Sequence, residues 1–379
     1  MLKIKWQKIL TKTMLWWVLL LILTFNVRFY LNFLPKEEML FRDSKGILAC
    51  SNFKNTGLPW ECPDYFYGRF LRELLGQVTF LHSHTNAVIY FILAIFLLCV
   101  AHLLATLQTF QQRALGLVLF LSPAMALLVQ RANLDILTFS LSWLAVKLFI
   151  RDRISLSLFF VFLASSFKIY PIALFLLLVG IALFKEVSAK AKIFWVLLTG
   201  FALWSVLIDI LKISWLPSDA RNSFGLRIFG EYFTYLFSGS GYQMLPLFGI
   251  LLGVLILAFT TILMASSKFE NSFPRFEVSL ESTIWLLYFL AIFASGISID
   301  YRLIFLLPSL IIMTELNKLM RYVVTLLLIS SFYLSYPFEI LQVFGDIALF
   351  ILLSFNIILL YKNHETFFKK TKLWRAGAS

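Results

Sequence analysis

Charged residues are scarce in this chain of 379 residues, at 14% of the sequence. A soluble domain would carry about 25%, so the composition excludes an ordinary soluble globular protein. Hydrophobic residues make up 60% of the chain, and 41 residues are Phe. The apolar runs are continuous rather than alternating, which is typical of membrane helices. We therefore expect an all-α fold, a polytopic transmembrane helical bundle.

The sequence also lacks the common motifs of soluble enzymes. It contains no Gly-rich phosphate loop, no zinc-binding spacing, no Ser-His-Asp order, and neither a repeat nor a low-complexity linker. His82 and His84 have no third ligand nearby, so we expect no metal and no cofactor. The whole chain, 1–379, is expected to form one integral membrane domain.

Cysteine is nearly absent, with three residues in the chain. Cys99 lies in an apolar run, whereas Cys50 and Cys62 share one polar loop. In an oxidising compartment these two could close a disulfide. Sequence gives no sulfur geometry, so the free and bonded forms both stay open.

Long apolar runs predict about twelve membrane crossings with both termini cytosolic, in the plasma membrane. The first run follows a Lys-rich segment and has no small-residue cleavage pattern after it, so we expect an uncleaved helix. Polar external loops are expected at 35–85 and 213–243. The expected spans are 14–34, 86–106, 114–130, 133–150, 155–167, 170–184, 193–212, 244–266, 282–298, 303–319, 322–338 and 342–361.

The distribution of charge agrees with this topology. The cytosolic side receives 20 of the 33 basic residues and 7 of the 20 acidic ones, which leaves +13 there and zero outside. A bias of Lys and Arg toward the cytosol is what the positive-inside rule expects. The basic composition therefore reflects orientation, and we expect membrane lipids rather than nucleic acid as partners.

Two external stretches, Phe66–Val78 and Phe224–Leu236, place apolar residues at helical spacing with Arg and Glu between them. This pattern predicts amphipathic helices lying on the membrane surface. Ordinary loop helices packed on the bundle would give the same pattern.

Several polar residues are expected at the outer ends of helices. A charge at the centre of a membrane helix costs roughly 2.5–3.5 kcal/mol, so such residues mark a membrane surface or a polar cavity. The spans 155–167 and 170–184 are each shorter than the roughly 20 residues that a membrane crossing needs. They can work as a pair if Lys168 lies in a polar cavity sunk into the outer face. The set comprises Arg131, Asn133, Asp135, Lys168, Tyr170, Asp300, Tyr301 and Arg302.

This inventory suits the binding of an anionic phosphate and the handling of a hydroxyl proton. Arg offers a planar fork to phosphate oxygens and Lys a point charge. A carboxylate near an acceptor hydroxyl can take its proton as general base. The first external loop supplies three such acids, Asp43, Glu61 and Asp64.

The order of these residues resembles the glycosyltransferase C superfamily, and most closely its polytopic mannosyltransferases that use polyprenyl-phosphate sugars. The resemblance covers residues 60 to 310. Ala132 stands where relatives often have Gly. The matching residues are Asp64, Tyr67, Leu74-Leu75-Gly76 and Phe80, then Pro123, Arg131-Ala132-Asn133-Leu134-Asp135, Lys168-x-Tyr170-Pro171, Asp300-Tyr301-Arg302 and Leu307-Pro308.

The resemblance implies inverting transfer of a hexose such as mannose from a polyprenyl-phosphate donor to a glycan or glycolipid acceptor on the extracytoplasmic face. It assigns the base to Asp64, with Glu61 and Asp43 as rivals. Lys168, Arg302 and Arg131 would hold the donor phosphate. The remaining residues, Asn133, Asp135, Tyr170, Asp300 and Tyr301, would shape the sugar pocket or brace the cations.

Plainer interpretations stand beside these. Asp64 can be a solvated loop acid, Lys168 a cation reaching the interface, and Arg131 with Asp135 a structural i, i+4 ion pair. A transporter or flippase of lipid-linked or anionic solutes is the main rival function, and a non-catalytic assembly factor another. A transporter would favour inverted repeats and charges near the midplane, whereas the charges here are expected at one face.

Overall fold

The fold is taken from a computed structural model. It describes residues 84–131, 133–168, 170–183, 188–212, 279–294, 298–314, 318–334 and 344–358, together with 223–224, 254–255, 258, 316 and 360. The helices within these ranges are α5 (Thr85–Thr106), α6 (Phe110–Phe120), α7 (Pro123–Arg131), α8 (Asp135–Ile150), α9 (Ile154–Phe167), α10 (Pro171–Leu183), α11 (Ala189–Lys212), α14 (Leu280–Ala294), the 3₁₀ helix η5 (Asp300–Thr314), α15 (Lys318–Leu334) and a last helix over 344–358.

The described part of the chain is almost entirely helical, so the expected all-α class holds for it. One exception is a two-residue antiparallel pairing of β1 (Ser223–Phe224) with β2 (Ser298–Ile299). The predicted interfacial helix Phe224–Leu236 is therefore wrong at its first residue, which has strand geometry. The rest of that stretch, and all of the stretch Phe66–Val78, lie outside the described residues.

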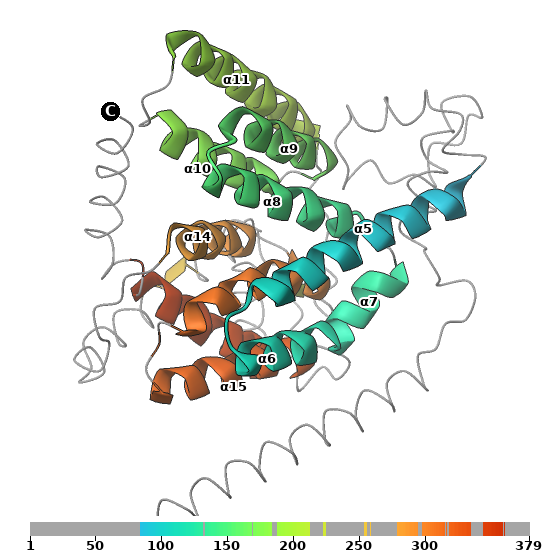
Figure 1. Ribbon diagram of the computed structural model, residues 1–379, viewed down its shortest axis with the longest axis vertical. Helices are drawn as coiled ribbons and strands as arrows, with labels where there is room; N and C mark the ends of the chain where they lie inside the picture. The colour runs from blue at the N-terminus through green and yellow to red at the C-terminus, as the bar shows by residue number, and fades with distance from the viewer. Residues whose placement is uncertain are drawn as a thin grey trace, which may run out of the picture.

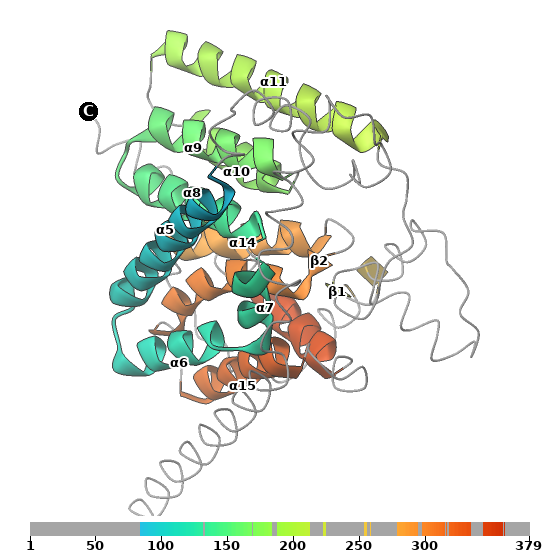
Figure 2. The ribbon, with the colours of Figure 1, turned by 90° about the vertical axis from the view of Figure 1, so that its right-hand side faces the viewer.

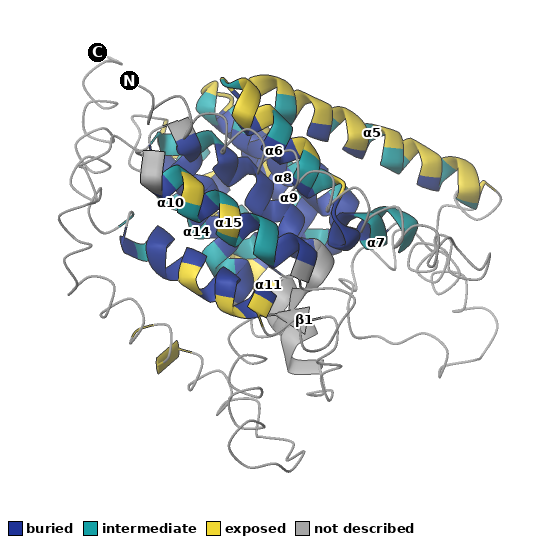
Figure 3. Cartoon of the chain, turned by 90° about the horizontal axis from the view of Figure 1, so that it is seen from below, coloured by how far each residue is buried: buried dark blue, intermediate teal, exposed yellow. Residues whose placement is uncertain are grey.

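The helices pack in chain order in one part of the molecule and across it in another. Helices α8, α9, α10 and α11 form consecutive antiparallel neighbours, and η5 and α15 pack beside α6 and α7 (Figures 1 and 2). Helix α14 joins the two groups, because it packs against η5 as well as against α8 and α10. Apolar side chains from both groups join in one core. Figure 3 shows the buried residues concentrated between the helices. The core therefore lies between the two groups of helices and fixes their relative positions.

The expected span 114–130 is two helices, α6 and α7, bent by 57°. The cause is local: Pro123 has no N–H to continue α6, and it suits the first position of a new helix. Ser122 precedes it and accepts a hydrogen bond from the Met125 backbone N–H at 3.4 Å. The predicted crossing at this place is therefore bent, and the two helices together are apolar and long enough for one broken span or a re-entrant loop.

The expected helix over 303–319 is the 3₁₀ helix η5, which contains Pro308. Such helices rarely exceed four residues, and this one is supported from outside. The Gln112 side chain, itself fixed in the capping box of α6, donates from Nε2 to the Leu310 carbonyl at 2.9 Å. One carbonyl of η5 thus has a hydrogen-bond partner on α6.

Helix α5 is, within the described ranges, the single helix long and apolar enough to cross a membrane, and the bent pair α6–α7 passes the same test jointly. Both statements follow from the length and composition of these helices. The twelve predicted crossings stay a prediction.

Candidate functional site

Asp135 stands at the start of α8, directly after the break that separates α8 from α7. Leu134 is the last residue of that break, and the Oδ1 of Asn133, one residue earlier, accepts a hydrogen bond from the Asp135 backbone N–H at 2.9 Å. The Asn133 carbonyl accepts from Ile136 N at 2.9 Å. Asn133 therefore starts the helix in the manner of a capping residue, and the Asp135 carboxylate is left fully buried.

A second turn brings Lys168 and Tyr170 to this carboxylate. Helix α9 ends at Phe167, Lys168 has extended backbone angles, and Pro171 begins α10. Proline disfavours helical geometry in the residue before it, so the chain turns here. The Tyr170 hydroxyl donates to Asp135 Oδ1 at 2.5 Å, and Lys168 Nζ lies 3.8 Å from the same oxygen.

Arg302 approaches from a third segment, at the start of η5. Its Nε lies 3.5 Å from Asp135 Oδ2, and its guanidinium carbon lies 4.9 Å from the centre of the Tyr170 ring. Lys168 and Arg302 are 4% and 8% exposed. Two buried cations therefore meet one buried carboxylate, and the Coulomb attraction between them is strong because little water screens it.

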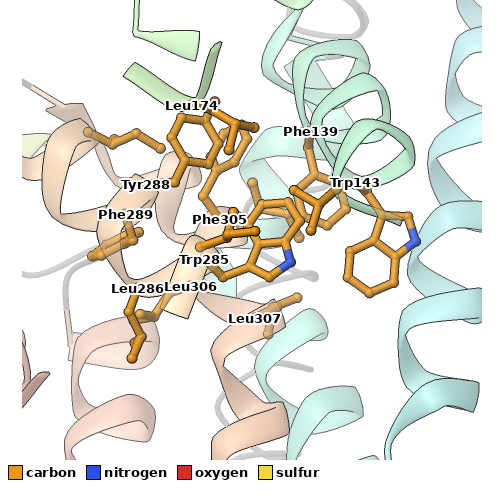
Figure 4. Packing of buried hydrophobic residues seen from close by; sticks show 14 of the residues in the cluster. Phe139, Trp143, Leu174, Trp285, Leu286, Tyr288, Phe289, Phe305, Leu306 and Leu307 are labelled. Atoms are coloured by element: carbon orange, nitrogen blue, oxygen red, sulfur yellow. The ribbon is translucent and has the colours of Figure 1, made fainter. Parts of the chain in front are cut away.

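Aromatic rings lie beneath this cluster. Tyr170 and Tyr288 both pack edge-on against Phe305, at centroid distances of 5.4 and 5.5 Å. The Tyr288 hydroxyl lies 3.4 Å from Ser142 Oγ on α8. Figure 4 shows Tyr288, Phe305, Trp285 and Phe139 pointing toward one another from α14, η5 and α8. This packing restricts the rotamer of Tyr170 and so the direction of its hydroxyl.

The structure thus brings together Asp135, Lys168, Tyr170 and Arg302 from three segments, with Asn133 beside them. Arg131 is half-buried at the end of α7. A break separates Arg131, the last residue of α7, from Asp135, the first residue of α8, so the two do not share the continuous helix that the i, i+4 spacing assumed. The backbone of Asp300 and Tyr301 opens η5, immediately before Arg302.

The acids of the first external loop lie outside the described residues. This holds for Asp43, Glu61 and Asp64, the candidate bases, and for Cys50 and Cys62, the candidate disulfide. Their assignments stay predictions. Among the described side chains, no group of three His, Cys, Asp or Glu is placed to hold a metal ion.

The opposite end of α8 carries a different cluster. Lys147 Nζ lies 2.6 Å from Glu281 Oε1 at the start of α14, and 4.5 Å from the centre of the Trp143 ring. Trp143 Nε1 donates to His102 Nδ1 on α5 at 3.2 Å. Lys147 follows Asp135 by twelve residues, or about 18 Å of helix. The buried cluster around Asp135 therefore occupies one end of the bundle.

Sequence reasoning missed two polar residues of interest. Tyr288 sits in an apolar run of α14 with nothing to distinguish it from the other tyrosines. Asp346, in the helix 344–358, is 5% exposed, and among the described residues neither carboxylate oxygen has a hydrogen-bond partner. An acid inside an apolar run was a signal that could have identified it.

Comparison of the chain with protein-family models, curated proteins and solved structures finds no match.

Proposed function

We propose that this chain is an integral membrane glycosyltransferase that moves a hexose, with inversion, from a polyprenyl-phosphate donor to a glycan or glycolipid acceptor. The observation that carries the proposal is the meeting of Lys168, Arg302 and Tyr170 at Asp135. Lys168, Tyr170 and Arg302 lie 33, 35 and 167 positions after Asp135 along the chain. The resemblance to polyprenyl-phosphate mannosyltransferases rests in part on the same residues.

A membrane location is supported by the apolar surface of α5 and α11. On α5, Phe91 and Leu98 are 67% and 70% exposed, and on α11 Leu197 and Trp204 are 67% and 63% exposed. Soluble monomers rarely expose contiguous apolar patches of this kind. Figure 3 shows exposed residues along most of α5. Lipid acyl chains cover such surfaces at no cost in free energy, so both helices fit the periphery of a membrane bundle.

The donor phosphate suits the two cations. A polyprenyl-phosphate sugar is a phosphodiester, and its leaving group gains negative charge as the glycosidic bond breaks. Lys168 and Arg302 are poorly hydrated, so charge that develops near them is stabilised more strongly than in water. In this proposal, Asp135 and Tyr170 act as positioning residues that hold the two cations at a fixed separation before substrate arrives.

The chemical step needs a base as well. A carboxylate of the first loop, Asp64 or its rivals Glu61 and Asp43, takes the proton of the acceptor hydroxyl. The acceptor oxygen then attacks the anomeric carbon from the side opposite the phosphate. The carbon–oxygen bond to the phosphate breaks, and polyprenyl phosphate leaves with the electron pair. Asp135 is unsuited to this role because its oxygens already contact Tyr170, Lys168 and Arg302.

Sugar transfer by the purified protein in liposomes tests the proposal. The donor is a polyprenyl-phosphate carrying radiolabelled mannose, offered with a panel of glycan and glycolipid acceptors. We expect Lys168→Gln and Arg302→Gln each to lower kcat/KM about 10²–10³-fold, as loss of one group that stabilises developing charge does. Asp64→Asn tests the base in the same assay.

Lys147→Gln is the matched control, because it removes a cation from the far end of α8 and should leave the rate close to the parental value. If no polyprenyl-phosphate sugar is transferred, the enzyme proposal is wrong. If transfer occurs but the Lys168 and Arg302 variants keep the parental rate, these residues do not hold the donor.

A further inference from the structure

Basic side chains gather at the end of the bundle opposite Asp135, on two separate turns. Arg151 and Arg153 flank Asp152 between α8 and α9, and all three are exposed. Lys190, exposed, and Lys192, half-buried, lie in the first turn of α11. Figures 1 and 2 both show the α8–α9 turn and the start of α11 on the same side of the bundle. These two turns, which carry four cations and one acid, therefore lie at the same end of the bundle.

The α8–α9 turn has a fixed geometry. Asp152 has a positive φ of 59°, Arg153 N donates to Leu148 O at 2.9 Å, and Asp152 N donates to Phe149 O at 3.1 Å. This is the pairing of a Schellman motif, which closes a helix with one left-handed residue. Because the backbone is held on both sides of Asp152, Arg151 and Arg153 leave the bundle from fixed points.

The start of α11 is also fixed. Ser188 Oγ accepts from Ala191 N at 3.3 Å, and its carbonyl accepts from Lys192 N at 3.2 Å. These bonds place Lys190 and Lys192 in the first turn. An exposed apolar face begins directly after them, and it includes Ile193, Phe194, Val196, Leu197, Phe201 and Trp204. The two basic residues at the start of α11 are therefore followed directly by an exposed apolar face on the same helix.

We propose that the α8–α9 turn and the first turn of α11 bind the headgroup of an anionic phospholipid, whose acyl chains lie along the exposed face of α11. The combination fits both parts of such a lipid: Arg and Lys bind the phosphate, and the exposed apolar face of α11 contacts the acyl chains. A zwitterionic lipid offers the same chains with no net charge, so selectivity comes from the four cations. The inference rests on the membrane location proposed above and is independent of sugar transfer.

Lipid binding to the purified protein tests the proposal. Phosphatidylglycerol and phosphatidylcholine with identical acyl chains are titrated into the detergent-solubilised protein and bound lipid is counted by native mass spectrometry. One basic residue near an anionic surface corresponds to about a fivefold preference. We expect at least that preference for phosphatidylglycerol in the wild type. Replacing Arg151, Arg153, Lys190 and Lys192 together by Gln should reduce it to near unity.

A charge-retaining variant guards against misfolding. Arg151→Lys and Arg153→Lys combined with Lys190→Arg and Lys192→Arg should keep the preference. Equal binding of the two lipids by the wild type would overturn the proposal, and so would an undiminished preference in the Gln variant. Inorganic phosphate at the lipid's concentration should not displace phosphatidylglycerol. Displacement would show a site for free anions instead of a lipid.

Discussion

The Asp135→Asn substitution tests how strongly the buried cluster depends on one negative charge. The change keeps the shape of the side chain and an oxygen that can accept the Tyr170 hydrogen bond. It removes the charge that lies 3.5 Å from Arg302 Nε and 3.8 Å from Lys168 Nζ. The substitution therefore isolates the ionic contribution to stability.

The magnitude follows from these distances and from burial. At an effective dielectric constant of 20, each of the two contacts is worth about 4 kcal/mol of Coulomb energy. Desolvation of the three buried groups offsets much of that gain in the intact cluster. Removing the carboxylate leaves the desolvation of the cations in place, so we expect a loss of about 3–5 kcal/mol in the free energy of unfolding.

The assay is equilibrium unfolding of the protein in mixed micelles, with the denaturing detergent as the variable. Asp346→Asn is a matched control, because it makes the same chemical change at another buried acid. In the described part of the chain the Asp346 oxygens have no hydrogen-bond partner, so this variant should be neutral or more stable. A parental unfolding curve for Asp135→Asn would refute the reasoning, and so would equal losses in the two variants.

Three further substitutions test single contacts. Tyr170→Phe removes a hydrogen bond to a charged acceptor and should cost about 1.5–3 kcal/mol of unfolding free energy. A cost near zero would show that the 2.5 Å contact with Asp135 does not contribute to stability. Gln112→Leu leaves the Leu310 carbonyl without its 2.9 Å partner and disrupts the capping box of α6. We therefore expect the free energy of unfolding to fall by about 1–3 kcal/mol. The control Gln111→Leu, on the exposed face of the same helix, should be neutral. Lys147→Gln breaks the pair with Glu281 at a site 16% exposed and should cost about 1 kcal/mol of unfolding free energy, measured by the same unfolding curves. A loss as large as that of Asp135→Asn would contradict the argument that burial makes the Asp135 contacts stronger.

Helix positions were largely predictable because apolar runs in this chain end at polar or Pro residues. The predicted spans 155–167 and 170–184 differ from α9 and α10 by at most one residue at either end, and Pro171 begins the second helix. The bend at Ser122-Pro123 and the 3₁₀ winding of η5 were not predicted. Apolar periodicity reports length and burial, and it does not distinguish a continuous helix from two capped halves.

The sequence also indicated which residues belong to the polar cluster, because a charged residue between apolar runs marks a membrane surface or a polar cavity. It did not indicate the internal arrangement of the cluster. Spacing alone suggested Arg131 as a neighbour of Asp135, and it gave no sign that Lys168 and Arg302, which are distant in sequence, also lie beside that carboxylate. Tyr288 was missed because long-range packing, which sequence spacing does not encode, decides which side chains meet. Asp346 was missed although its position inside an apolar run was a usable signal.

The most direct test of the proposed function is an experimental structure of the protein with a polyprenyl phosphate bound. The account predicts the phosphate within hydrogen-bonding distance of Lys168 Nζ and the Arg302 guanidinium, with the lipid chain leaving between helices at that end of the bundle. A phosphate bound elsewhere, with the Asp135 cluster closed and dry, would contradict it.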